Sequence, residues 1–150
     1  MTFSPIARIL GLTVLAFPAA ALAEVPLSVE IDGSVSAYAE SMTEGVFDAQ
    51  TVLAVKSLTY QKAVAISCAA FDVDDAKFQE AFGLVFPPAE VFDALPEDEQ
   101  MKIQTVGLLT IGTFLGMHLA VAEADKDGFC ANAEAERDAP QAGPMIWMAK

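Results

Sequence analysis

The longest uninterrupted apolar pattern in the chain covers residues 96–124, PEDEQMKIQTVGLLTIGTFLGMHLAVAEA, and it predicts one long helix over about 97–124. Between Lys102 and Glu123 no residue carries a fixed charge. Pro96 suits the first turn of a helix, and the three acidic residues that follow it favour the positive end of a helix dipole. The other segments are best understood as elements that pack against this helix.

The apolar stretch 103–122 has two interpretations. Its twenty residues match the hydrocarbon thickness of a bilayer, so it could be a membrane span. Alternatively, it is the central helix of a soluble bundle, apolar nearly all round because neighbours cover it. We favour the bundle, because both flanks are acidic and lack the Lys/Arg cluster that orients a span. Polar groups are also spread along the stretch, at Gln104, Thr105, Thr110, Thr113 and His118.

A stripe of small residues runs along the same helix at Gly112, Gly116 and Ala120. Such a stripe lets two helices approach closely, either in a membrane or within a bundle. A glycine inside a helix costs about 1 kcal/mol relative to alanine, so two in one stripe indicate close packing there. The alternative is that these glycines are tolerated without a special role. Larger apolar residues, among them Leu108 and Phe114, occupy the opposite faces of the helix.

The rest of the chain predicts further helices and turns. Asp48 and Asp74 are candidate N-caps, each at the start of a segment with helical spacing of apolar residues. Together with the long helix, these segments predict an all-α fold, a small bundle of four to five helices. We expect an extended arm over 24–33 and helices over 34–44, 48–71, 75–82 and 89–95.

The two ends of the chain differ from its middle. Residues 1–23 contain Arg8, an apolar run and the sequence Ala-Leu-Ala before Glu24, which is the pattern of a secretory signal peptide, with an uncleaved anchor as the alternative. We expect a helical domain over 24–131. Residues 132–150 are predicted to be a flexible C-terminal tail, whose last six residues (MIWMAK) either dock on the bundle or mark a contact site. Docking is the favoured interpretation of those six.

The charge balance narrows the class of partner. The chain has 8 basic and 21 acidic residues, a net charge of −13, and removal of residues 1–23 takes away one basic residue and leaves −14. Nucleic-acid binders need clustered Lys and Arg, so this balance argues against nucleic acid. It also disfavours anionic membrane surfaces. It fits an exported protein, periplasmic or secreted, or one with a basic protein partner.

The only two cysteines, Cys68 and Cys130, are expected to form a disulfide, because an even count in an exported chain indicates pairing. Two free thiols or a metal pair are the alternatives. A structural metal site needs about four ligands, and two distant cysteines with one histidine do not supply them. We therefore predict no metal site. The disulfide would connect the helix over 48–71 to the far end of the long helix.

Candidate chemistry is sparse. His118, the only histidine, could ligate a haem together with Met42 or Met101, but a hydrogen-bonded structural histidine is favoured. The segment that begins at Asp125 resembles the start of a calcium loop, yet Cys130 stands where the loop needs glycine. No nucleophile motif, such as G-x-S-x-G, and no phosphate-binding glycine loop is present. We therefore expect no catalytic residues and no bound cofactor.

These patterns do not specify a function. The favoured hypothesis is an exported, non-enzymatic binding, interaction or accessory protein. One alternative is a membrane-associated accessory subunit with 103–122 inserted in the bilayer. A weaker alternative is a helical-bundle carrier of haem that uses His118.

Overall fold

A computed structural model of the chain describes residues 27–138 and 145–150, and the predicted signal peptide over 1–23 lies outside them. The described residues form an all-α bundle with one disulfide, which confirms the predicted fold class. They contain six helices rather than four to five, and two short strands. These elements are α1 (Leu27–Thr43), α2 (Ala49–Ser67), β1 (Phe71–Val73), α3 (Asp75–Gly83), α4 (Ala89–Phe92), α5 (Glu97–Ala124), α6 (Lys126–Asp138) and β2 (Trp147–Ala149).

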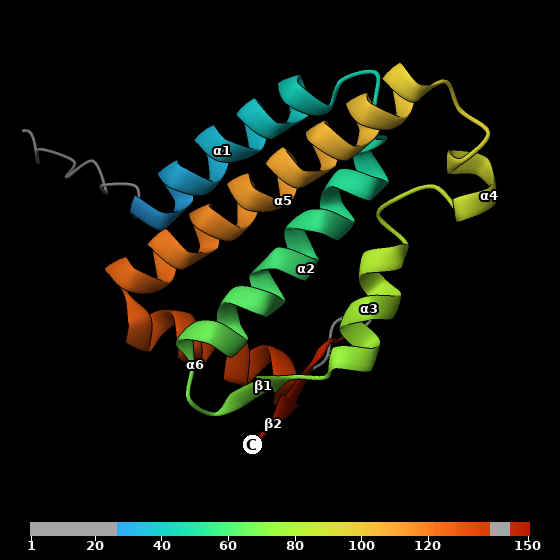
Figure 1. The fold of residues 1–150 in the computed structure, drawn as a ribbon. Helices are drawn as coiled ribbons and strands as arrows, with labels where there is room; N and C mark the ends of the chain where they lie inside the picture. Colours follow the sequence, from blue (N-terminus) through green and yellow to red (C-terminus); the bar gives the residue numbers. More distant parts are fainter. Residues whose placement is uncertain (1–26, 139–144) are drawn as a thin grey trace, which may run out of the picture.

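The long helix α5 has the bounds that the sequence predicts, and α1 and α2 pack along it on two sides (Figure 1). The predicted N-caps are also present. The backbone N–H of Thr51 donates to Asp48 at the start of α2, and that of Lys77 donates to Asp74 at the start of α3. The helix α2 ends at Ser67, four residues before the predicted end, because Phe71 begins β1.

The first helix corrects one expectation. An extended arm was predicted up to residue 33, but α1 is already helical from Leu27. Tertiary contacts explain the difference, because Ile31, Val35 and Ala39 recur at a spacing of four and pack on the core, and packing overrides weak propensity. Lys56 on α2 also bridges to Asp32, with a nitrogen–oxygen distance of 2.8 Å.

The C-terminal region also differs from its prediction. Residues 132–138, assigned to a flexible tail, form the second half of α6. The last residues dock, as favoured, because β2 pairs antiparallel with β1, with Val73 opposite Trp147 and Phe71 opposite Ala149. Ile146 and Trp147 are buried. The sequence missed this docking site because a three-residue strand pair leaves no periodic pattern.

Two hydrophobic clusters fill the bundle. The first lies between α1, α2 and α5 and includes Val55, Leu58 and Phe114. The second lies at the end where α6 and the strand pair cross, and it includes Phe71 and Trp147. The disulfide between Cys68 and Cys130 belongs to the second cluster, with a sulfur–sulfur distance of 2.02 Å, and it ties the end of α2 to α6. The candidate site lies at the end of the bundle that contains this second cluster.

The predicted packing ridge is not a contact between the described residues. Gly112, Gly116 and Ala120 are all exposed, and a Cβ added at either glycine would meet no atom within 4 Å. The glycine of α5 that is closely packed is Gly107, where an added Cβ would lie 2.7 Å from Cε1 of Phe86. The ridge prediction was wrong for the bundle because glycine spacing alone does not say which side of a helix its neighbours cover.

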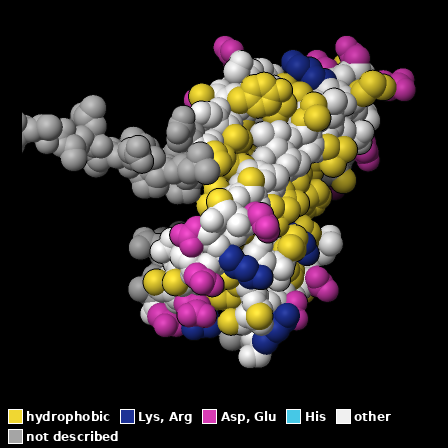
Figure 2. All heavy atoms as spheres, turned by 90° about the vertical axis from the view of Figure 1, so that its left-hand side faces the viewer, with side chains coloured by type: hydrophobic (Ala, Val, Ile, Leu, Met, Phe, Trp, Pro, Cys, Tyr) yellow, Lys and Arg dark blue, Asp and Glu magenta, His cyan; other side chains and the backbone are white. Residues whose placement is uncertain are grey.

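The exposed side of α5 also carries large apolar side chains, among them Leu108 and Leu109. We call the exposed residues of α5 its outer face. Figure 2 shows hydrophobic and other uncharged side chains over most of the upper half of the surface in view, with charged side chains near its top edge and over the lower half. Between Lys102 and Glu123 the outer face comprises Gln104, Thr105, Leu108, Leu109, Gly112, Gly116 and Ala120, and Met101 is exposed beside Lys102.

By length and composition, α5 is also the one described helix that could cross a membrane. Its most apolar 18-residue window has a mean hydropathy of 1.7, and 33% of that window is buried in the structure. A central helix of a soluble bundle would be mostly buried. The helix α5 is therefore covered on one side and bare on the other.

Candidate ligand-binding pocket

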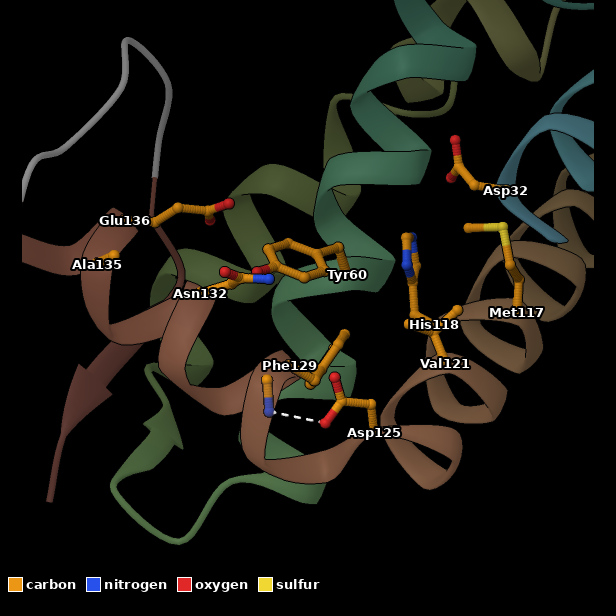
Figure 3. Close-up of a pocket in the computed structure, with 11 residues that line it drawn as sticks. Asp32, Tyr60, Met117, His118, Val121, Asp125, Phe129, Asn132, Ala135 and Glu136 are labelled. Atoms are coloured by element: carbon orange, nitrogen blue, oxygen red, sulfur yellow. Dashed lines mark hydrogen bonds between the residues drawn. The ribbon is translucent and has the colours of Figure 1, made fainter. Parts of the chain in front are cut away.

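A pocket of about 590 Å³ opens where α5 turns into α6. Its walls come from α1, α2, α5 and α6, so residues far apart in the sequence meet there. Figure 3 shows Tyr60 of α2 in the middle of the pocket, with Asn132 and Glu136 of α6 on one side and His118 of α5 on the other. The volume lies in the range of sites that bind small molecules.

The turn between the helices is built by Asp125. This residue leaves the helical conformation, with φ −148° and ψ 76°, and its Oδ1 accepts a hydrogen bond from the backbone N–H of Gly128 at 3.0 Å (Figure 3). It therefore ends α5 and caps α6. Gly128 has no room for a side chain, because an added Cβ would collide with the Asp125 carboxylate. The segment at Asp125 that resembles the start of a calcium loop is therefore a helix cap.

Tyr60 is the aromatic centre of the pocket. Its ring meets the rings of His118 and Phe129 edge to face, each with a centroid distance of 5.4 Å, and that of Trp147 at 5.9 Å. Burial, with the nearby Glu136 carboxylate, raises the pKa of the Tyr60 hydroxyl to about 12. The hydroxyl therefore stays protonated at neutral pH, near the Glu136 carboxylate.

His118 is 8% exposed and is neutral at physiological pH, because burial lowers its pKa to about 4. Its Nε2 lies 3.2 Å from the backbone carbonyl oxygen of Lys56. A carbonyl only accepts, so Nε2 carries the proton and Nδ1 is left as an acceptor. His118 is therefore hydrogen-bonded, as the sequence analysis favoured. Met101, one of the two methionines considered as a haem partner, lies 17 residues earlier, about 25 Å along the helix.

Carboxylates surround the aromatic centre. Glu136 has a raised pKa because it is partly desolvated, an effect that the nearby Tyr60 hydroxyl opposes. Asp32 is paired with Lys56, whereas Asp125 is held by its capping bond. No Lys or Arg is among the described lining residues. The pocket is therefore rich in hydrogen-bond acceptors and poor in positive charge.

The lining combines polar and apolar side chains. Its titratable groups are Tyr60, His118 and three carboxylates, and the described lining residues include no Ser, Thr, Cys or Lys. Nor do the described residues contain a group of three or more His, Cys, Asp or Glu side chains that could hold a metal ion. The lining does combine apolar side chains, such as Val121 and Phe129, with a few polar groups, which is typical of small-molecule sites.

Sequence reasoning reached only part of this pocket. It singled out His118 and Asp125, and the predicted pair of Cys68 and Cys130 lies just behind the pocket, where it fixes α6 on α2. Tyr60 and Glu136 were missed. The signal that could have found them is the disulfide itself, because Cys68 follows Tyr60 and Cys130 precedes Glu136 by roughly two helical turns each.

Comparisons with known proteins add no relative. No protein-family model, no curated protein and no solved structure matches the chain.

Proposed function

We propose that this chain is an exported, non-enzymatic binding protein that holds a small molecule in the pocket between α2, α5 and α6. The observation that carries the proposal is the pocket of about 590 Å³, walled by aromatic and apolar side chains and edged by a few polar groups. The disulfide supports export, because such bonds persist in oxidising compartments. It also holds α6 in place, so the pocket exists before a ligand arrives.

A pocket-filling variant tests this function. Ala135 of α6 lines the pocket and is exposed, so Ala135→Phe should occupy the cavity without disturbing the core. Ala131→Phe is the matched control, because Ala131 is also exposed on α6 but does not line the pocket. The protein would be recovered from an exporting host, and its native and denatured masses compared.

The parent protein and Ala131→Phe should carry a non-covalent adduct in the native mass, and Ala135→Phe should lose it. The denatured mass should begin at Glu24 and rise by two protons on reduction. An adduct that survives in Ala135→Phe would place the ligand elsewhere. Protein without any adduct, in the parent as in the variants, would contradict the binding function.

A second candidate function is that of a membrane-associated accessory subunit, and the outer face of α5 is the observation that favours it. Leu108 is 63% exposed and Leu109 is 53% exposed in a stretch that has no charge. The opposite side of α5 supports the bundle, because His118 bonds to the backbone of α2 and insertion of 103–122 would break that contact.

Carbonate extraction separates the two functions. A binding protein of the bundle type is released into the soluble fraction by alkaline carbonate. An inserted subunit stays with the membrane, and Leu109→Glu should then release it, because a charge in the hydrocarbon core costs about 2.5–3.5 kcal/mol. Retention of the parent chain would replace the first proposal by the second.

A further inference from the structure

We propose that the ligand of this pocket is an organic cation, an ammonium group carried on an apolar aromatic scaffold. This inference rests on the proposed binding function and names the class of ligand. It is argued from the hydrogen-bonding groups, the charges and the rings that line the pocket.

The described residues that line the pocket include no Lys or Arg. Of its three lining carboxylates, Asp32 is neutralised by Lys56, whose nitrogen lies 2.8 Å away. Asp125 and Glu136 have no described ion-pair partner. Two carboxylates at the edge of a partly apolar cavity, in a protein with a net charge of −13, attract a cation and repel an anion.

The buried histidine points to the same ligand independently of the carboxylates. His118 lines the pocket, and because its Nε2 bonds to the backbone of Lys56, its Nδ1 is the ring atom that can accept from a ligand. A ligand that donates several N–H groups could bond to this acceptor and to the carboxylates, whereas one that only accepts could not.

The aromatic rings of the pocket indicate what the rest of the ligand is. Tyr60 and Phe129 present aromatic surface in the pocket, and Met117 and Val121 add apolar surface beside His118. Aromatic faces attract ammonium groups and also pack on other rings. A bare metal ion fits less well, because the described residues offer no cluster of three ligating side chains.

The experiment compares three compounds of nearly equal shape by calorimetric titration at pH 7. They are 2-phenylethylammonium, the neutral 2-phenylethanol and the anionic 3-phenylpropionate. Glu136→Gln removes one carboxylate charge at nearly constant shape, and Glu134→Gln is its control, because Glu134 is an exposed residue of the same helix outside the pocket lining. Nα-acetyl-lysine methylamide represents a lysine side chain of a protein partner.

We expect the ammonium compound to bind at least about tenfold more tightly than the alcohol, and the carboxylate not to bind. Glu136→Gln should weaken ammonium binding about tenfold, whereas Glu134→Gln should leave it unchanged. Equal binding of the three phenyl compounds would overturn the cation but leave the pocket function standing. Tighter binding of the lysine mimic would overturn the aromatic scaffold. Absence of all binding in a parent that still carries its native adduct would overturn this inference alone.

Discussion

The two sides of α5 have similar composition and opposite surroundings. On the inner side Phe114 is 1% exposed and Gly107 lies against the Phe86 ring. On the outer face Leu109 is more than half exposed, and Gly112 has open space around it. Both sides are apolar, so hydrophobicity alone does not decide which side is core. The neighbours α1 and α2 decide it.

The largest expected loss of stability comes from truncating a buried side chain on the inner side of α5. Phe114→Ala removes a fully buried ring from the first cluster and should lower the free energy of unfolding by about 3–5 kcal/mol. Leu109→Ala on the outer face should change it by less than about 0.5 kcal/mol. Chemical denaturation measures both. Similar losses for the two variants would show that a partner or a membrane covers the outer face.

The disulfide strengthens the inner side only, because it ties α2 to α6. Cys68→Ser opens a loop with a sequence separation of 62 residues and should lower stability by about 4 kcal/mol in the chain-entropy model. The reduced parent protein is the control and should melt with the variant. Equal melting temperatures for the variant and the oxidised parent would show that the bond contributes nothing in solution.

The inner side should also be sensitive to acid. Burial lowers the pKa of His118 to about 4, below its ordinary 6.5, and Asp32 and Lys56 are the charged groups that face it. The unfolded chain therefore binds a proton more readily between these pH values. The contribution of neutral His118 to the free energy of unfolding should be fully present above pH 6.5. It should be lost as the pH drops toward 4, by on the order of 2 kcal/mol.

The control for this pH dependence is His118→Gln, which keeps a polar side chain at the site but cannot titrate. Its free energy of unfolding should vary less between pH 6.5 and 4 than that of the parent. Urea unfolding at a series of pH values provides the measurement. The same slope in both proteins would assign the acid sensitivity to carboxylates instead of His118.

The sequence predicts most of the secondary structure of this fold and little of its site. The caps at Asp48 and Asp74, the bounds of α5 and the cysteine pair follow from local chemistry, so they could be read directly. The helix over 27–33 could not, because its stability comes from packing on α5 and α2. The pocket likewise depends on how α6 folds back after Asp125, a direction that no local pattern records.

The glycines illustrate the same limit. A stripe with a spacing of four looks like a contact surface in any sequence, and the sequence alone favoured Gly112 and Gly116 over Gly107. The structure reverses that order, because Phe86 comes from a loop between short helices whose position depends on the whole bundle.

The smallest expected change in stability should have opposite signs on the two sides of α5. Gly112→Ala should raise the free energy of unfolding by about 0.5–1 kcal/mol, because alanine favours the helix and its Cβ meets no neighbour. Gly107→Ala places the same methyl group against Phe86 and should lower stability by about 1 kcal/mol, since overpacking outweighs the gain in helix propensity. Denaturation of both variants under one condition checks the pair. A loss at Gly112 equal to that at Gly107 would mean that the outer face of α5 is packed against a second molecule in solution.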